Sequence, residues 1–166
     1  SIVEQFLSLA RPLEIKPEEL RLQDILKELA ALEEGNAKQW KVQIRVVASA
    51  DLPPLKADRE YLRQSLLNLI LNGLQAMPEG GTLTLEAKTS NSNFLIAVTD
   101  TGTGIAPENL SRIFEPYFTT KAQGSGLGLA ISRWIIEAHR GTITAANESG
   151  GGCRVEITLP LNGAEV

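Results

Sequence analysis

The sequence contains few of the residues that disulfides and metal centres require. Its 166 residues include one cysteine, Cys153, and one histidine, His139. A lone cysteine cannot form an internal disulfide, and the two residues supply no metal cluster. We expect Cys153, in the segment GGCRVEITLP, to be a small buried residue of a strand.

Long apolar runs and an excess of positive charge are also absent. No run approaches the length that spans a membrane, and no signal-peptide pattern is present, so we expect a cytoplasmic chain or part of a larger, membrane-tethered protein. The net charge of −4 argues against nonspecific nucleic-acid binding. Any affinity for phosphate must therefore be local, with Lys121, Arg112 and Arg133 as candidates near the glycine clusters.

What is present is an ordinary globular composition and a distinctive stretch from residue 94 to residue 130. Phe94, Ile96 and Val98 alternate with other apolar residues, which predicts a strand covered on both faces. Asp100 continues the parity of these residues, so its carboxylate should point toward the packed side and needs a donor. The exocyclic amine of a ligand base would supply one, and so would an ordinary backbone or side-chain donor.

Two glycine clusters follow that strand. Gly102 and Gly104, in DTGTG, allow close approach of a flat ligand, although a plain glycine turn explains that motif equally simply. Gly124, Gly126 and Gly128 precede an apolar helical pattern, and the free N–H groups of a helix start suit a phosphate. The second cluster lacks the Lys-Ser ending of a Walker motif and the acidic residue of a dinucleotide fingerprint.

A second informative element is the helix predicted over residues 58–76, with Asp58 as its N-cap. Asn68 and Asn72 lie one turn apart on the face opposite its leucines. Asparagine is a poor helix former, so the pair is either a solvent-facing stripe or a functional site. In the functional interpretation, the amide oxygen of Asn72 binds Mg²⁺ that also contacts ligand phosphates.

The remaining pattern predicts short elements joined by turns. We expect a linker over residues 11–19 and possible fraying of the second helix at Gly35-Asn36. The expected helices cover residues 1–10 and 22–39, and the expected strands cover residues 40–47, 82–89, 93–100, 142–147 and 154–159.

The order of these motifs, N-L-I-L-N-G, D-T-G-T-G, I-F-E-P-Y-F-T-T-K and G-S-G-L-G-L over about residues 58–160, closely resembles the catalytic ATP-binding domain of sensor histidine kinases of the nitrogen-regulator type. That domain belongs to the superfamily of gyrase B, Hsp90 and MutL. The resemblance implies a two-layer α/β sandwich of the Bergerat type, in which helices cover one face of a mixed sheet. ATP would lie between the helices and a flexible lid.

The resemblance also implies roles for individual residues. Asn72 would bind Mg²⁺, Asn68 would lie beside the triphosphate, and Asp100 would accept from the adenine amine. Lys121 would contact phosphate, and Phe114 and Phe118 would anchor the lid. The other implied ATP contacts are Gly102, Gly104, Ile105, Thr119, Thr120, Gly124, Ser125, Gly126, Leu127 and Gly128.

One position separates the kinases from the ATP hydrolases of this superfamily. The hydrolases resemble each other in placing a glutamate, the base for water, one turn before the metal-binding asparagine. Here that residue is Asn68, which cannot take a proton at neutral pH. We therefore expect slow hydrolysis and transfer of the γ-phosphoryl group by positioning and charge neutralisation, with Asn68 and Lys121 as the catalytic residues.

The phosphoacceptor histidine of the family is absent, because His139 lies in EAHRG, where the family has a histidine in a packing or capping role. Gly73 also replaces the commoner alanine. Residues 1–19 resemble the end of a dimerisation-domain helix with its linker, residues 20–163 the catalytic domain, and residues 164–166 a tail. The implied partners are ATP or ADP, a histidine-bearing dimerisation domain, a response-regulator receiver domain and a second copy in a homodimer. The parent would be cytoplasmic or a membrane-anchored sensor.

Overall fold

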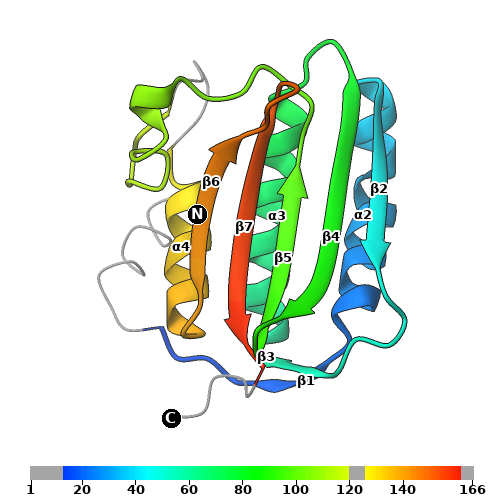
Figure 1. The fold of residues 1–166 in the computed structure, drawn as a ribbon, viewed down its shortest axis with the longest axis vertical. Coiled ribbons are helices and arrows are strands. Elements are labelled where there is room, and N and C mark those ends of the chain that lie inside the picture. Colours follow the sequence, from blue (N-terminus) through cyan, green and yellow to red (C-terminus); the bar gives the residue numbers. More distant parts are fainter. Residues whose placement is uncertain (1–12, 120–125, 162–166) are drawn as a thin grey trace.

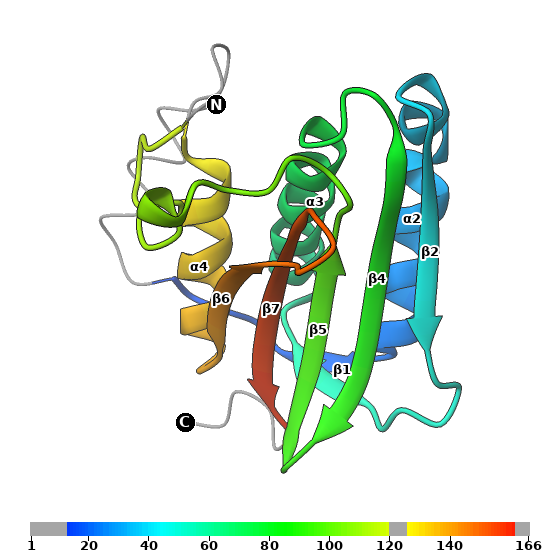
Figure 2. The ribbon, with the colours of Figure 1, turned by 45° about the horizontal axis from the view of Figure 1, so that its top comes forward.

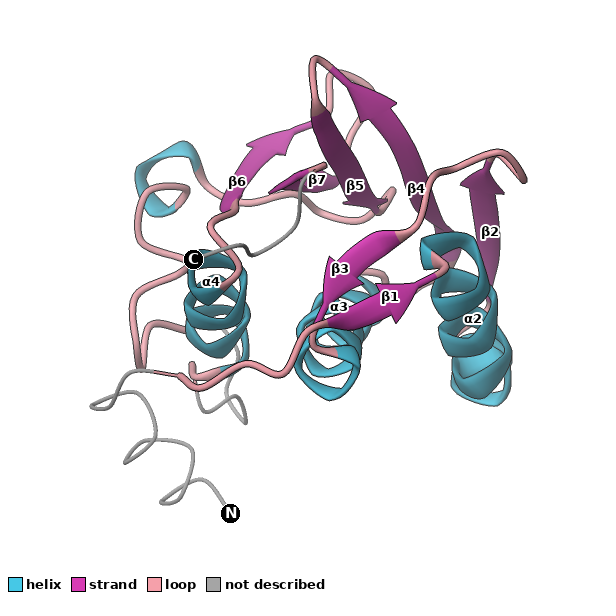
Figure 3. Cartoon of the chain, turned by 90° about the horizontal axis from the view of Figure 1, so that it is seen from below, coloured by secondary structure: helices cyan, strands magenta, loops and turns pink. Residues whose placement is uncertain are grey.

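The computed structural model describes residues 13–119 and 126–161. Within them, helices cover one face of a five-stranded mixed sheet, as predicted (Figures 1 and 3). The strand order is β2-β4-β5-β7-β6, with β2 and β4 parallel and the other neighbours antiparallel. The strands are β2 (Val42–Ala48), β4 (Gly81–Ser90), β5 (Asn93–Thr99), β6 (Thr142–Asn147) and β7 (Cys153–Pro160). The expected helix over residues 1–10 lies outside the described residues.

The helical layer consists of α2 (Leu22–Gln39), α3 (Arg59–Gln75) and α4 (Gly128–Ala138), with α3 in the middle (Figure 3). The leucines on one face of α3 are buried, as its periodicity predicts, and they form the core with the inward residues of the sheet. At its start, Asp58 Oδ1 accepts a hydrogen bond from the N–H of Tyr61, which confirms the predicted N-cap.

The other face of the sheet is mostly polar, and no helix of the described residues covers it. Arg154 of β7 pairs there with Glu86 at 3.2 Å and with Glu156 at 3.7 Å. Alternating strands with one apolar face and one charged face give this two-layer arrangement, because only one face can stably pack against helices.

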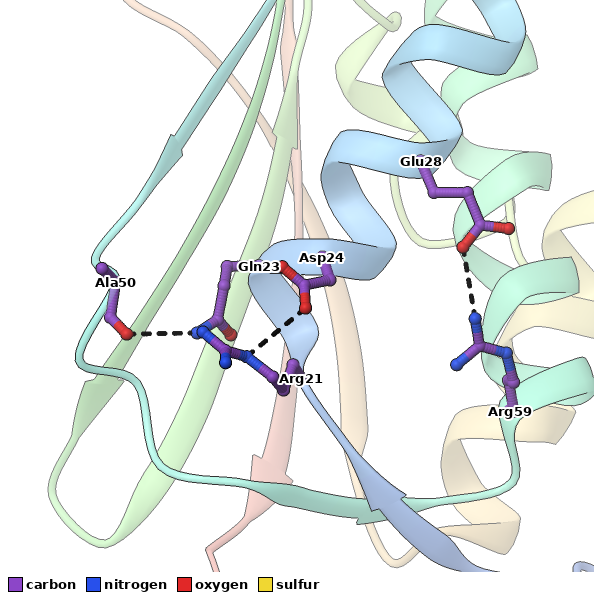
Figure 4. Close-up of polar contacts among 6 residues, drawn as sticks. All are labelled: Arg21, Gln23, Asp24, Glu28, Ala50 and Arg59. Atoms are coloured by element: carbon purple, nitrogen blue, oxygen red, sulfur yellow. Dashed lines mark hydrogen bonds and ion pairs between the residues drawn. The ribbon is translucent and has the colours of Figure 1, made fainter.

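Helix α2 runs without interruption past Gly35, so the fraying suggested by Gly35-Asn36 does not occur. A Cβ on Gly35 would meet nothing within 4 Å, and the Asn36 amide donates to Glu33 Oε2 at 2.8 Å. Figure 4 shows two further contacts of this helix. The side chain of Gln23 donates to the carbonyl oxygen of Ala50 at 3.3 Å, and Arg59, the first residue of α3, donates to Glu28 Oε2 at 3.3 Å.

The expected linker is partly ordered on the domain. Glu18–Leu20 form a short strand, β1, which pairs antiparallel with β3 (Leu55–Ala57) at the end of the molecule opposite residues 100–119 (Figure 1). Three-residue strands carry too few residues for a period to show, which is why the sequence did not reveal them. The N–H of Lys16 also donates to Asp58 Oδ2 at 2.8 Å.

Candidate functional site

A cleft of about 660 Å³ opens between α3, the segment that follows β5, and the start of α4. Figure 2 shows these three segments at the same end of the sheet. The predicted site residues that line it are Asn68, Asn72, Gly104, Ile105, Phe118, Thr119, Gly126 and Gly128. Its volume lies in the range of small-molecule sites.

The two asparagines of α3 face this cleft and not open solvent. Both are half-buried, and the Asn68 amide Nδ2 donates to the carbonyl oxygen of Gly128 at 3.1 Å. This bond joins the central helix to the first residue of α4. Because the amide nitrogen is committed to Gly128, Asn68 positions the start of α4, where helix geometry leaves N–H groups without intrahelical partners.

Asp100 is buried, with 6% of its surface exposed, as the strand parity predicted. Its Oδ1 accepts hydrogen bonds from the N–H of Gly102 at 2.9 Å and the N–H of Cys153 at 3.2 Å. Backbone donors therefore satisfy this oxygen, which is the ordinary alternative considered from the sequence. Asp100 is not among the residues that line the cleft, but the loop it holds is.

Gly102 is needed for contact with the end of α3. A Cβ at this position would lie 2.1 Å from the carbonyl oxygen of Ala76, and the N–H of Thr103 donates to that same oxygen at 3.3 Å. Gly104 has a φ of 75°, which favours glycine. The glycines of the D-T-G-T-G motif therefore allow its loop to pack closely against the end of α3.

The segment between the loop and α4 is described over residues 106–119 and 126–127, and both parts contact the rest of the domain. Phe114 is buried in the core, while Phe118 lines the cleft and carries the guanidinium of Arg112 4.7 Å from its ring centroid. The N–H of Tyr117 donates to the carbonyl oxygen of Gly126 at 2.9 Å. A Cβ on Gly126 would lie 2.4 Å from the Tyr117 carbonyl carbon, so this crossing requires glycine.

Four predicted contacts, Thr120, Lys121, Gly124 and Ser125, lie outside the described residues. The other candidate cations form local ion pairs, Arg112 with Glu115 at 3.4 Å and Arg133 with Glu137. Leu127 is fully buried, and its side chain packs in a second apolar cluster with Ile131, Ile135 and Leu13 instead of lining the cleft.

The structure adds cleft residues that the site prediction omitted. They are Leu71, Gln75, Ala76, Thr103, Ala106, Asn109, Ile113 and Leu129. Helical spacing from Asn68 and Asn72 could have identified Leu71 and Gln75. The other residues line the cleft because of the path that the loops take through the fold, and no local sequence pattern predicts that path.

Cys153 is a buried strand residue, as predicted. Burial raises the pKa of its thiol to about 11, and the negative charges of Asp100 and Glu148 act in the same direction. The thiol is therefore inert at neutral pH. The residue supports the loop through its backbone N–H, which donates to Asp100.

Comparisons with known proteins give a consistent family. The sequence model described as "Histidine kinase-, DNA gyrase B-, and HSP90-like ATPase" matches residues 57–163. The chain is 39% identical over 161 residues to the sensor histidine kinase ZraS of Escherichia coli (strain K12), covering 97% of this chain and 35% of that protein. It is 36% identical over 162 residues to sporulation kinase E of Bacillus subtilis (strain 168), covering 97% and 22%. The chain thus spans about a third or less of these relatives.

Solved structures agree with the sequence comparison. Full-length ShkA in complex with AMPPNP matches with a TM-score of 0.87 and 31% identity over 95% of this chain and 34% of that one. Histidine kinase ThkA in complex with the response regulator protein TrrA matches with a TM-score of 0.82 and 26% identity over 96% and 46%. Among the described residues, no helix is both long and apolar enough to span a membrane.

Proposed function

Because this chain belongs to the family of histidine kinase-, DNA gyrase B- and HSP90-like ATPases, we propose that it is the ATP-binding catalytic domain of a two-component sensor histidine kinase. The observation that carries the proposal is the cleft, which brings the asparagine face of α3, the D-T-G-T-G loop and the glycine start of α4 together. The similarity to sensor kinases over nearly the whole chain selects the kinase branch of the family.

In this proposal, adenine binds toward the Asp100 loop and the phosphates toward the start of α4. Oδ1 of Asp100 accepts from backbone N–H groups, so we place the exocyclic amine of the base at Oδ2, just behind the cleft lining. The glycine segment, with Lys121, Thr119, Thr120 and Ser125, surrounds the phosphates. The N–H groups at the start of α4 and the positive end of its dipole favour the anionic phosphates.

The donor set fits a magnesium ion that arrives with the nucleotide. Among the described residues, no group of three or more His, Cys, Asp or Glu side chains could hold a metal by itself. Mg²⁺ commonly takes one or two protein oxygens and completes its shell with water and substrate phosphates, so the single amide of Asn72 suffices. The bound ion would supply charge neutralisation at the phosphates. Replacing Asn72 with leucine removes the amide oxygen, and this change should weaken binding of Mg²⁺-ATP more than binding of metal-free ADP.

The reaction transfers the γ-phosphoryl group to a histidine of another domain. The bond between the γ-phosphorus and its bridging oxygen breaks, a phosphorus–nitrogen bond forms, ADP leaves and the imidazole loses its proton to water. Asn68 offers no base to activate water, because a side-chain amide does not take a proton at neutral pH. The γ-phosphoryl group is therefore retained for the acceptor.

His139 does not serve as that acceptor. The side chain is 2% exposed, its Nε2 accepts from the N–H of Asp58 at 3.0 Å, and its Nδ1 lies 2.8 Å from the carbonyl oxygen of Ile135. Both nitrogens are thus engaged away from solvent. We therefore propose that the acceptor is carried by a histidine-bearing dimerisation domain of the same full-length protein.

We further propose the wider organisation that follows. Residues 1–19 join the dimerisation domain to the catalytic domain at residues 20–163, and residues 164–166 form a tail. The full protein is a homodimer whose phosphohistidine supplies a response-regulator receiver domain, and the catalytic domain works in the cytoplasm, where ATP is available.

The test is transfer between separate chains. This chain is incubated with γ-labelled ATP, Mg²⁺ and a dimerisation fragment that carries the acceptor histidine. We expect acid-labile label on the fragment, none on this chain, and slow release of phosphate when the fragment is omitted. A fragment in which the acceptor histidine is replaced by glutamine is the control.

The alternative is an ATP hydrolase or a nucleotide-gated binding module of the same family. A hydrolase would release phosphate at the same steady rate with and without the acceptor fragment. A binding module would bind ATP, leave the fragment unlabelled and release no phosphate.

A further inference from the structure

The connection between β6 and β7 lies against the loop that forms one wall of the cleft. At the end of β6, Asn147 Oδ1 accepts a hydrogen bond from the N–H of Ile105 at 2.8 Å, and Asn147 Nδ2 donates to the carbonyl oxygen of Ile105 at 2.6 Å. One side-chain amide thus pairs with both backbone groups of one residue, as a neighbouring strand would. The two residues are 42 positions apart in the chain.

The same connection also holds the start of this loop. The N–H of Cys153 donates to Asp100 Oδ1, and a Cβ on Gly152 would lie 2.0 Å from the carbonyl oxygen of Asp100. A Cβ on Gly104 would in turn lie 3.0 Å from Asn147 Oδ1. Residues 100–105 are therefore packed against the β6–β7 connection at both ends.

The two ends are held by different kinds of contact. At Asp100, backbone bonds continue the pairing of β5 with β7, with the N–H of Asp100 donating to the carbonyl oxygen of Cys153 at 2.9 Å. At Ile105, the sheet pairing of β5 has ended, and a single side chain, that of Asn147, bonds both the N–H and the carbonyl oxygen of this residue. Asn147 is the last residue of β6 and is paired with Cys153 in the sheet, so substituting its side chain releases the far end of the loop while the backbone pairing can remain.

We propose that Asn147 is a positioning residue for the base-binding wall of the cleft. By fixing the backbone of Ile105, it sets where Thr103, Gly104 and Ala106 line the cleft. This inference rests on the proposed nucleotide site, and it adds a residue that lies outside the cleft lining and outside the motifs discussed above. A side chain of this type acts by preorganisation, because the loop is ordered before the ligand arrives.

The expected consequence is a change in nucleotide affinity. Replacing Asn147 with alanine removes two hydrogen bonds between exposed groups, and at the low end of their usual worth this weakens binding by about fivefold to tenfold. The loss should be equal for ATP and ADP, since the loop faces the base. Replacing Asn147 with aspartate keeps an acceptor for the Ile105 N–H but places a carboxylate oxygen against the Ile105 carbonyl, so it should weaken binding at least as much.

The experiment measures ATP and ADP dissociation constants by calorimetry for this chain and for Asn147→Ala and Asn147→Asp. Asn93→Ala is the matched control, because the amide of Asn93 bonds the carbonyl of Asn91 at 3.3 Å in the β4–β5 turn. In transfer to a separate histidine-bearing fragment, the Asn147 variants should raise KM for ATP by the same factor while kcat stays within twofold. Mere loss of folded protein would lower kcat and leave KM unchanged.

Two failures are distinguishable. If the parent chain binds neither ATP nor ADP, the proposed function is wrong. If the parent binds both nucleotides, and both Asn147 variants match it within twofold in dissociation constant and KM, then the proposed function stands and the role of Asn147 is refuted. KM is independent of the active fraction, so it remains decisive if a variant is less stable.

Discussion

Replacing His139 tests whether the only histidine of the chain is structural. The N–H of Asp58 can only donate, so Nε2 of His139 is the unprotonated nitrogen and Nδ1–H donates to the carbonyl oxygen of Ile135. The imidazole thereby connects the end of α4 to the start of α3. The Asp58 carboxylate in turn caps α3 and accepts from the N–H of Lys16.

The magnitude follows from what each substitution leaves behind. Leucine has nearly the volume of histidine, so His139→Leu leaves no large cavity but strands the buried N–H of Asp58, at a cost of about 1–3 kcal/mol. The Ile135 carbonyl keeps the backbone N–H of His139 at 3.2 Å, so little is lost there. For a domain of this size, a loss of about 2 kcal/mol lowers Tm by roughly 4–8 °C. His139→Gln can keep an acceptor near Asp58 and should recover at least half of the loss.

Urea unfolding of the parent and both variants measures these differences, and trans-phosphorylation of a separate acceptor fragment measures function. We expect His139→Gln to bind ATP and label the fragment like the parent. Equal unfolding free energies for the parent and His139→Leu would refute the capping argument. Labelling of the parent chain itself that His139→Gln abolishes would refute the conclusion that this histidine is no acceptor.

Three further predictions concern the loop and its neighbours. Asp100→Asn should preserve the fold, because an amide oxygen can still accept from Gly102 and Cys153, but calorimetry should show adenine nucleotides bound at least tenfold more weakly, about 1.4 kcal/mol. With a pKa of about 11, about one Cys153 thiol in a thousand is ionised at pH 8, so thiol reagents should label the folded chain far more slowly than the urea-unfolded chain. Gly102→Ala should lower Tm and weaken nucleotide binding together, because its Cβ would lie 2.1 Å from the Ala76 oxygen, and unchanged values would contradict the close contact.

The elements with a clear period could be predicted from the sequence, and the contacts that join them could not. The bounds of α2, the cap of α3 at Asp58 and the burial of Asp100 follow from local patterns, and the structure confirms them. The pairing of β1 with β3 and the hydrogen bonds of Asn147 to Ile105 connect residues about 40 positions apart. Such contacts depend on the tertiary path, and a single sequence contains no local signal for them.

Long-range contacts of this kind also hold the cleft in shape. Several of the bonds that hold its walls are neutral: Asn68 bonds Gly128, Thr103 bonds Ala76, and Asn147, which lies outside the lining, bonds Ile105. The Asp100 carboxylate, which accepts from Gly102 and Cys153, is the charged exception. The ion pairs of the described residues, such as Arg133 with Glu137, lie on partly or fully exposed side chains and contribute little each. Neutral hydrogen bonds are less sensitive to salt than charge pairs, so we expect the cleft to keep its geometry as ionic strength changes. In the proposed nucleotide complex, the charge brought into the cleft would be that of the nucleotide and its magnesium ion, so nucleotide affinity should depend on ionic strength more than the shape of the cleft does.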